Sequence, residues 1–452
     1  MRLSTCLPAI AALAVASLAA IDPALAQEEA AAEAAEVAAN GVPPEVKFVF
    51  NTLLFLVGGF LVMWMAAGFA MLEAGMVRTR NVSMQCLKNI GLYSTAGLMF
   101  WLFGYNLMYE GVNGGFIGTP VWFSHPAHGA EDITEAAGTS DWFFQMVFCA
   151  ATASIVSGAV AERVKLWPFI VFVAVLTGIF YPISGSWQWG EGWLYGLGFS
   201  DFAGSTIVHS VGGWAALTGC ILLGARTGKY DAEGRVTPLP GSSMPLATLG
   251  VFILWLGWFG FNGGSQLALG SLTDASDVAR IFANTNTAAA AGVIVAMVLS
   301  QVIYGKVDLT FALNGALAGL VSITAEPLTP SFLMAAIIGG IGGAIVVVGV
   351  PLLDRLRVDD VVGAIPVHLF AGIWGTLAVP LTNPETSFAI QLLGVAAYGA
   401  FTVVATTILW LILKATIGIR ITKEQEETGL DTLEVGIEAY PEFAHGSQRL
   451  RA

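Results

Sequence analysis

Long apolar runs separated by short polar segments dominate the chain from residue 49 onward. Most runs hold about 20 residues, the length that an α-helix needs to cross the hydrocarbon layer of a membrane. The pattern therefore predicts an all-α, polytopic membrane protein with eleven transmembrane helices. The expected helices cover residues 49–77, 85–109, 141–160, 167–185, 201–224, 245–271, 277–303, 309–326, 331–353, 361–380 and 388–417.

The composition supports a chain surrounded by lipid. Hydrophobic residues make up 56% of the 452 residues and charged residues 11%, whereas an ordinary soluble domain is about 25% charged. The 53 glycines fit a helical bundle, because small residues let membrane helices approach closely. A net charge of −13 argues against a nucleic-acid partner bound through a basic surface. We expect the surface of the protein to contact the lipid bilayer and no nucleic acid.

Metal, disulfide and cofactor chemistry finds no support in the sequence. The cysteines are widely spaced and form no C-x-x-C pair. His125 and His128 form an H-x-x-H segment, but the sequence offers no evident third ligand. We therefore expect neither a metal site nor a cofactor. The four cysteines are Cys6, Cys86, Cys149 and Cys220.

The N-terminal segment predicts a secretory signal peptide over residues 1–26. A basic start precedes a short apolar stretch over residues 7–20, and residues 24–26 offer an A-x-A cleavage site. The alternative is an N-terminal anchor that is not cleaved. Residues 27–46 follow as an Ala/Glu-rich lead of low complexity, which predicts a solvated tail or a frayed helix.

Lysine and arginine are distributed unevenly over the loops and helix ends. Every second boundary, together with the C-terminal end, carries almost all of them, while the five intervening loops carry only Arg280. Cytoplasmic loops of membrane proteins carry the excess of these residues. We therefore expect an inner-membrane protein with its N-terminus outside, a transmembrane domain over 47–418 and a cytoplasmic tail over 419–452. The cation-rich set is Arg78, Arg80, Lys88, Arg163, Lys165, Arg226, Lys229, Arg235, Lys306, Arg355, Arg357, Lys414, Arg420, Lys423, Arg449 and Arg451.

The number of helices allows an internal repeat. Eleven helices divide into two halves of five and one C-terminal helix, and halves with an odd number of helices enter the membrane from opposite sides, as in many transporters. Two matching spacings support this division. Asp201 precedes His209 by eight residues, and Asp360 precedes His368 by eight. We expect two inverted five-helix repeats followed by a C-terminal helix.

Two histidines lie inside predicted helices, where the bilayer penalises ionisable groups. His209 shares a helix face with Asp201 and Ser205. Small residues near His368 would allow two neutral imidazoles to meet across a close helix interface. The alternative is two unrelated structural histidines that bond backbone or hydroxyl groups. We favour a functional pair, because ionisable groups within the membrane usually mark a pathway.

Aromatic side chains recur at helical spacing on two predicted helices and crowd one outer loop. A ring face can attract a small cation by about 0.5–2 kcal/mol. The alternative is a structural role, because tryptophan and tyrosine belts line membrane interfaces, and spacing alone favours a belt or core packing. The residues concerned are Phe144, Phe148, Trp187, Trp189, Trp193, Trp258, Phe261 and, on the same face as the last two, Ser265.

Several segments resemble the Amt/MEP/Rh superfamily of ammonium transporters, in order from about residue 49 to 440. Residues 201–209, DFAGSTIVH, are similar to the family's helix-5 motif, with Ser205 where glycine is usual. Residues 258–265, WFGFNGGS, are similar to its W-[FY]-G-F-N-x-G-S segment. Because several motifs occur together, the resemblance is specific. Further matches are residues 157–163, 314–320, 358–360 and 367–368.

The resemblance implies roles for these residues. Phe148 and Phe261 match a pair of stacked rings that gates the pore. His209 and His368 match twin histidines that line a narrow hydrophobic pore, along which Trp258 also lies. From the residues alone, the alternative for Asp201 is a helix N-cap. The implied ammonium-binding site at the outer face consists of Trp189, Phe148, Ser265, Phe144 and Asp201.

The resemblance also implies partners. The family fold is a homotrimer with one pore in each subunit. Residues 424–431, EQEETGLD, resemble a segment of the family's cytoplasmic tail, a region that in bacteria is linked to blockade by PII signal proteins. Glu73 departs from the pattern, because many members carry a neutral residue there. The sequence leaves open whether Glu73 pairs within the bundle or lies in a vestibule.

We therefore expect transport of ammonium or ammonia rather than an enzymatic reaction. Ammonium would bind at the outer face and lose a proton, and ammonia would pass the pore, because a bare cation cannot cross an apolar path cheaply. The sequence leaves open whether the proton follows. An ammonium sensor on the same fold is an alternative, disfavoured by a tail without a kinase-like or cyclase-like extension. An enzyme with a metal on His209 and His368 lacks further ligands.

Overall fold

The structure is a computed structural model that describes residues 42–126 and 135–443. The predicted signal peptide, residues 1–26, and most of the predicted lead, residues 27–46, lie outside the described residues. His128 also lies outside them, whereas His125 lies on an exposed loop.

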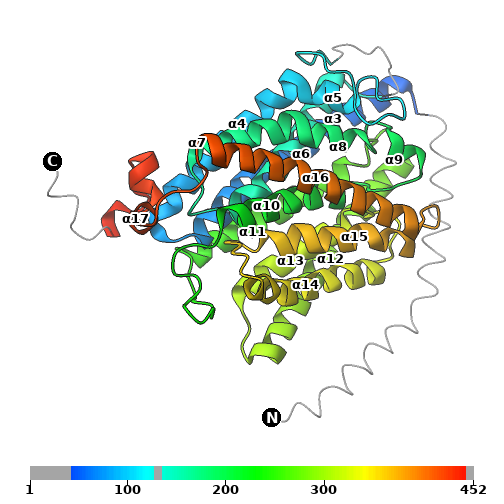
Figure 1. Cartoon of the computed structure of the whole chain (residues 1–452). Helices are drawn as coiled ribbons and strands as arrows, with labels where there is room; N and C mark the ends of the chain where they lie inside the picture. The colour runs from blue at the N-terminus through cyan, green and yellow to red at the C-terminus, as the bar shows by residue number, and fades with distance from the viewer. Residues whose placement is uncertain (1–41, 127–134, 444–452) are drawn as a thin grey trace, which may run out of the picture.

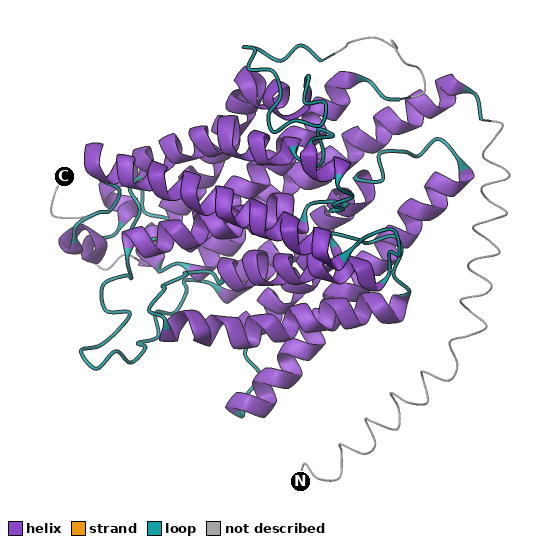
Figure 2. Ribbon diagram, turned by 45° about the vertical axis from the view of Figure 1, so that its right-hand side comes forward, coloured by secondary structure: helices purple, strands orange, loops and turns teal. Residues whose placement is uncertain are grey.

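Helices form the regular structure of the described residues, which contain no β-strand beyond isolated bridges (Figure 2). The α-helices are α3 (Pro44–Met76), α4 (Val82–Met99), α5 (Tyr105–Tyr109), α6 (Gly138–Ala159), α7 (Leu166–Val175), α8 (Tyr181–Ser186), α9 (Trp193–Gly196), α10 (Val211–Leu223), α11 (Met244–Gly264), α12 (Leu272–Tyr304), α13 (Leu309–Ile323), α14 (Phe332–Arg355), α15 (Ala371–Ala378), α16 (Phe388–Thr416) and α17 (Lys423–Thr428). Segments of π-helix are η3 (Phe100–Gly104), η4 (Leu176–Phe180), η5 (Ser205–Ser210), η6 (Ile365–Phe370) and η8 (Asp431–Val435), and short 3-10 turns are η2 (Thr79–Asn81), η7 (Val379–Leu381) and η9 (Pro441–Phe443).

The apolar runs of the sequence coincide with these helices. Among the described residues, 8 helices are long and apolar enough to cross a membrane. Two further apolar helices, over 309–323 and 365–381, are shorter. The run at 85–109 forms a helix in three pieces, because η3 interrupts it between α4 and α5. The all-α membrane-protein class is confirmed, whereas eleven crossings and an inverted repeat stay predictions.

Polar side chains mark where several long helices begin. Ser243, Ser271 and Ser331 each accept a hydrogen bond from a backbone N–H in the first turn of α11, α12 and α14. Asp308 does the same for α13. These side chains satisfy donors that a helix cannot pair internally. The local sequence therefore fixes the start of each helix, and the apolar runs set the length.

Glycines allow helix backbones to touch inside the bundle. A Cβ atom on Gly250 of α11 would overlap the backbone of Leu72 in α3. A Cβ atom on Gly343 of α14 would overlap the carbonyl of Gly292 in α12. The high glycine content thus serves close helix packing, as the composition predicted.

The bundle has two distinct ends. Figure 1 shows α17, in red, at the opposite end from α9. We call the end that carries α9 and residues 187–192 the Trp189 end, and the end that carries α17 and η8 the tail end. At the tail end the Asp431 carboxylate accepts the backbone N–H groups of Ser83 and Met84 at 3.0 and 2.8 Å. The tail is therefore docked on the start of α4.

One cation of the predicted cation-rich set is buried inside the bundle. Lys88 lies in α4, within the predicted helix 85–109, and is 0% exposed. Its charge is held by Glu73 of α3, with 3.6 Å between Nζ and Oε2. Arg163 and Arg226 do lie between helices, but both are buried and donate to groups of the segment 358–360. Buried ion pairs receive the charges of Lys88 and Arg226, and backbone carbonyls receive that of Arg163.

Candidate functional site

A cavity of about 320 Å³ opens at the Trp189 end of the bundle. Phe144, Phe148, Trp189 and Ser265, four of the residues predicted to bind ammonium, line it together. The Ser265 hydroxyl donates to the Phe261 carbonyl at 2.8 Å, so its oxygen remains available as an acceptor. The structure thus brings ring faces and a hydroxyl from α6, the end of α11 and the loop 187–192 around one hollow. Such a hollow can hold a small cation.

Two phenylalanine rings close the floor of this cavity. The rings of Phe148 and Phe261 lie 4.0 Å apart between centroids, with 30° between their planes. Both side chains are fully buried. Phe144 packs against Phe148 at 4.7 Å, and Trp189 meets Phe148 edge to face at 6.0 Å. The pair separates the cavity from His209, whose ring lies 5.2 Å from that of Phe261, and its role as a gate stays a prediction.

The two histidines meet directly behind Phe261. His209 Nδ1 and His368 Nδ1 lie 3.1 Å apart, and both side chains are buried. His209 stacks on Trp258, with 4.9 Å between ring centroids and 17° between planes. The indole N–H of Trp258 donates to Thr324 Oγ1 at 2.8 Å, which fixes the ring.

The hydrogen bond between the histidines restricts their protonation. One Nδ1 must carry a hydrogen and the other must offer a lone pair, so at least one ring is neutral. His209 Nε2 has no hydrogen-bond partner although it is buried. The pair therefore presents a free ring nitrogen inside an apolar surrounding. A small solute with N–H groups and a lone pair could bond to it.

Two similar segments carry the histidines. His209 lies in η5 and His368 in η6, and each π-helix follows a glycine with positive φ, Gly204 at 104° or Gly363 at 80°. π-Helical turns are rare and occur frequently at functional sites. The segments around His209 and His368 therefore share both the Asp-to-His spacing of the sequence and the backbone conformation that follows it.

Asp201 caps the segment that carries His209. Its carboxylate accepts backbone N–H groups of Gly204, Ser205, Thr206 and Ile207 at 2.8–3.1 Å. The side chain is 0% exposed and does not line the cavity, although the Trp189 indole N–H donates to its carbonyl at 3.0 Å. These contacts support the helix-cap alternative and give Asp201 a role in placing Trp189 and η5. A direct contact of Asp201 with ammonium stays a prediction.

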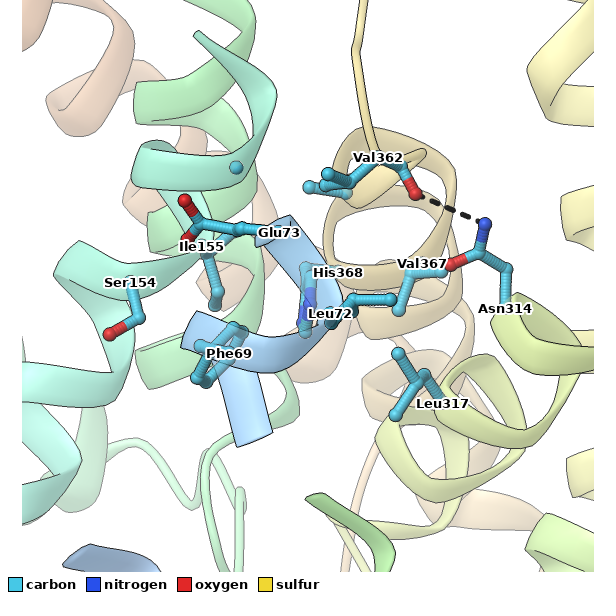
Figure 3. A pocket seen from close by; sticks show the side chains of 12 residues that line it. Phe69, Leu72, Glu73, Ser154, Ile155, Asn314, Leu317, Val362, Val367 and His368 are labelled. Atoms are coloured by element: carbon cyan, nitrogen blue, oxygen red, sulfur yellow. Dashed lines mark hydrogen bonds between the residues drawn. The ribbon is translucent and has the colours of Figure 1, made fainter. Parts of the chain in front are cut away.

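A second, very small cavity of about 10 Å³ lies on the far side of His368 (Figure 3). Phe69 and Leu72 of α3 and Ile155 of α6 line it with His368. This volume is about the size of one water molecule. Sequence reasoning did not identify Phe69, Leu72 or Ile155, because apolar residues in a membrane helix carry no signal that separates pore from core.

Other candidates are separated from this path. His125 is exposed on its loop and lines neither cavity. Within residues 42–126 and 135–443, no group of three or more His, Cys, Asp or Glu side chains could hold a metal ion. Cys86, Cys149 and Cys220 are free thiols.

Comparison with known proteins identifies the family. The model of the Ammonium Transporter Family matches residues 53–440. The chain is 41% identical over 418 residues to "Ammonium transporter Amt2" of Archaeoglobus fulgidus, covering 86% of this chain and 87% of that protein. It is 35% identical over 405 residues to "Ammonium transporter Amt2" of Methanocaldococcus jannaschii, covering 87% and 91%.

Solved structures agree with this assignment. A structure named "Sensor Amt Protein" aligns with a TM-score of 0.82 and 33% identity, covering 86% of this chain and 99% of that one. The crystal structure of Candida albicans Mep2 aligns with a TM-score of 0.75 and 26% identity, covering 90% and 94%. Together with the sequence motifs and the helical bundle, these matches show that the chain belongs to the Ammonium Transporter Family, the family that its motifs resemble.

Proposed function

We propose that this protein carries ammonium nitrogen across the membrane, with ammonium bound in the 320 Å³ cavity and ammonia passing the histidine pair. The single observation that supports this most is the order in which these groups contact one another. A cavity with a cation-attracting ring is followed by two stacked rings, then by two hydrogen-bonded histidines and then by a small cavity lined mainly by apolar side chains. From the outer cavity to the histidine pair, the groups offer less to a charge and no less to neutral ammonia.

This order supports discrimination between ammonium and potassium. An apolar path penalises any bare cation. Ammonium can give up a proton and continue as ammonia, which can bond to the free nitrogen of His209. Potassium has no proton to release, so it would have to cross as a charge. Potassium is then rejected because the apolar path offers nothing to replace the water that surrounds the ion. Selection by the size of the ion is not required.

Flux through the purified protein tests the proposal. Proteoliposomes that hold the full chain should acidify or alkalise internally when an ammonium gradient is applied, faster than empty liposomes do. The same gradient of potassium should produce no protein-dependent change. Equal rates with and without the protein, under conditions where the protein stays folded, would contradict transport.

Replacement of Trp189 with leucine should weaken ammonium binding. The cation loses a ring face worth about 0.5–2 kcal/mol, so we expect the concentration for half-maximal methylammonium uptake to rise by about twofold to thirtyfold. Trp122→Leu is the matched control, because Trp122 is exposed and does not line the cavity. If both variants give the wild-type curve, Trp189 belongs to the membrane-interface belt.

A sensor is a second candidate function, because a solved relative with 33% identity is named "Sensor Amt Protein". The same cavity could bind ammonium without passing it on. Tight ammonium binding to the purified protein, measured calorimetrically, together with no flux in proteoliposomes would favour the sensor. Flux that saturates with the binding constant would favour transport.

The proposal includes the orientation of the protein in the membrane and its assembly into oligomers. We place the Trp189 end outside and the tail end in the cytoplasm of a cell with an inner membrane, with two inverted repeats and a C-terminal helix giving eleven crossings. The exposed apolar faces of α3 and α12 suit lipid or a second subunit, in keeping with a homotrimer. The tail end would then be the surface that a PII signal protein meets.

Removal of the tail after Thr422 should abolish binding of a PII protein while the helix bundle stays assembled. The tail makes its own contacts: Glu426 is 1% exposed and accepts from Thr227 N–H at 2.7 Å and from Arg420 at 3.1 Å. Co-purification of a PII protein with the full and the shortened chain measures the effect, and gel filtration in detergent checks the assembly. Equal PII binding by both forms would contradict the prediction.

A further inference from the structure

The loop of residues 187–192 places a charged residue at the 320 Å³ cavity. Glu191 lines this cavity and is exposed, and among the residues that line it no other carries a charge. Within residues 42–126 and 135–443, no lysine or arginine forms an ion pair with Glu191. The Glu191 carboxylate therefore leaves an uncompensated negative charge beside the cavity.

The backbone at Glu191 adopts a conformation that disfavours any side chain. Its φ is 57°, in the left-handed region, where glycine is the usual residue. A glycine at position 191 would remove this strain at once. Strained residues that persist in folded proteins cluster at ligand-binding and catalytic sites, where the surrounding structure holds them in place. The strain therefore points to a function of the Glu191 side chain itself.

The surrounding loops hold Glu191 from both sides. The Glu191 N–H donates to the Gln188 carbonyl at 3.0 Å, and the Glu191 carbonyl accepts from the Gly114 N–H at 3.0 Å. A Cβ atom on either neighbour, Gly190 or Gly192, would overlap backbone carbonyl oxygens. In this tight turn, position 191 is thus the one that carries a side chain, and two backbone hydrogen bonds fix where that side chain starts.

The other polar groups of the cavity are neutral and act over shorter distances. The Ser265 oxygen is free to accept, and Gln188 Oε1 is buried without a hydrogen-bond partner. The cavity is far larger than one water molecule, so ammonium can enter it with water still around the ion. The Trp189 ring face and the hydroxyl need direct contact, whereas a charge acts over about 10 Å at 0.1 M salt. Glu191 can therefore attract an ion that the other groups do not yet touch.

We propose that the Glu191 carboxylate concentrates ammonium in the outer cavity before Trp189, Phe148 and Ser265 bind the ion. The inference rests on the proposed function and assigns Glu191 to its first step. Attraction by a charge raises the occupancy of the cavity and leaves the steps beyond the Phe148–Phe261 pair unchanged. Loss of the charge should therefore alter the half-maximal concentration and keep the maximal rate.

Three substitutions at position 191 separate the charge from the strain. Glu191→Gln removes the charge and keeps the size and the backbone strain, Glu191→Gly removes both, and Glu191→Asp keeps both. Glu385→Gln is the matched control, because Glu385 is exposed on the loop before α16 at the Trp189 end and does not line the cavity (Figure 1). Methylammonium uptake into proteoliposomes is measured over a concentration series in about 0.1 M and about 1 M sodium chloride, because salt screens a charge over these concentrations.

In the lower salt we expect Glu191→Gln and Glu191→Gly to raise the half-maximal concentration by about twofold to fivefold, as the loss of a partly exposed charge pair does. The maximal rate should stay at the wild-type value. In the higher salt the screening distance falls to about 3 Å, so the wild type should approach the two variants. Glu191→Asp and Glu385→Gln should follow the wild type in both salts.

Three results would overturn the inference and leave the proposed function standing. The first is a wild-type half-maximal concentration in Glu191→Gln at the lower salt. The second is an increase that is equally large in both salts, which would show a direct contact in place of attraction. The third is an increase in Glu191→Gln that Glu191→Gly does not share. A wild-type protein that neither takes up methylammonium nor binds ammonium would overturn the proposed function itself.

Discussion

Alanine at His209 or at His368 is expected to end the selective passage of ammonia. The two imidazoles share one hydrogen bond of 3.1 Å, so each ring holds the tautomer and orientation of the other. Loss of one ring leaves a buried nitrogen unpaired, at a cost of about 1–3 kcal/mol, and opens a space that water can enter. A wetted path no longer forces deprotonation. Either ammonia passage stops or potassium begins to compete with ammonium.

Ammonium flux with and without excess potassium measures this in both single variants and in the double variant. The double change should cost much less than the sum of the singles, because the first already breaks the pair. His125→Ala is the matched control, since that histidine is exposed on a loop. If all three pore variants keep wild-type flux and wild-type rejection of potassium, the histidines are structural.

The helical class was predictable because lipid imposes one requirement on every crossing segment. An apolar run of about 20 residues is enough to predict a helix that crosses the membrane. The structure places helices on all the predicted runs. The breaks inside them were not predictable. The π-helical segment η3 divides the run at 85–109, and η5 begins the run that carries His209. A π-turn arises from packing between helices, which the composition of one helix does not record.

The candidate site was predictable where chemistry is unusual for its surroundings. Two histidines within apolar helices stand out, and repetition of the Asp-to-His spacing linked them before their contact was known. Asp201 shows the limit of that reasoning. The sequence offered a binding role and a helix cap, and all the hydrogen bonds that its carboxylate accepts are those of a cap. Only coordinates show which donors surround a carboxylate.

Glu73 and Lys88 show why positions of charge need three dimensions. Lys88 was counted among the cations of loops and helix ends, because the charge pattern along the chain treats each cation near a helix end as solvated. The structure turns it inward, where it meets Glu73 and Ser157. The sequence had singled out Glu73 as a departure without finding its partner. A pair that is fifteen residues apart along the chain becomes visible only when α3 and α4 are placed side by side.

Alanine at Asp359 is expected to give the largest loss of stability. Its carboxylate accepts from Arg226 at Nε and at the terminal nitrogen, at 2.8 and 2.9 Å, and from the Arg226 backbone N–H at 2.8 Å. Both side chains are at most 5% exposed. Breaking a buried ion pair from one side leaves an uncompensated charge, which costs about 3–5 kcal/mol. Thermal unfolding of the purified protein in detergent should show a clearly lower midpoint.

The stability that the Asp359 carboxylate contributes should depend on pH. Burial acts to raise the pKa of Asp359, but the hydrogen bonds and charge of Arg226 and the charge of Arg163 outweigh burial and hold that pKa well below its ordinary value. A carboxyl with a lowered folded-state pKa contributes stability above its unfolded pKa, near 3.9, and loses it as the pH falls toward the folded value. The wild type should therefore lose part of its stability below about pH 4, and Asp359→Ala should lose less over the same range.

Asp231→Ala is the control, because the Asp231–Arg235 pair is exposed and its loss should leave the midpoint at pH 7 unchanged. Equal midpoints for Asp359→Ala and Asp231→Ala would mean that Glu162, 3.6 Å from Arg226, compensates the buried guanidinium by itself.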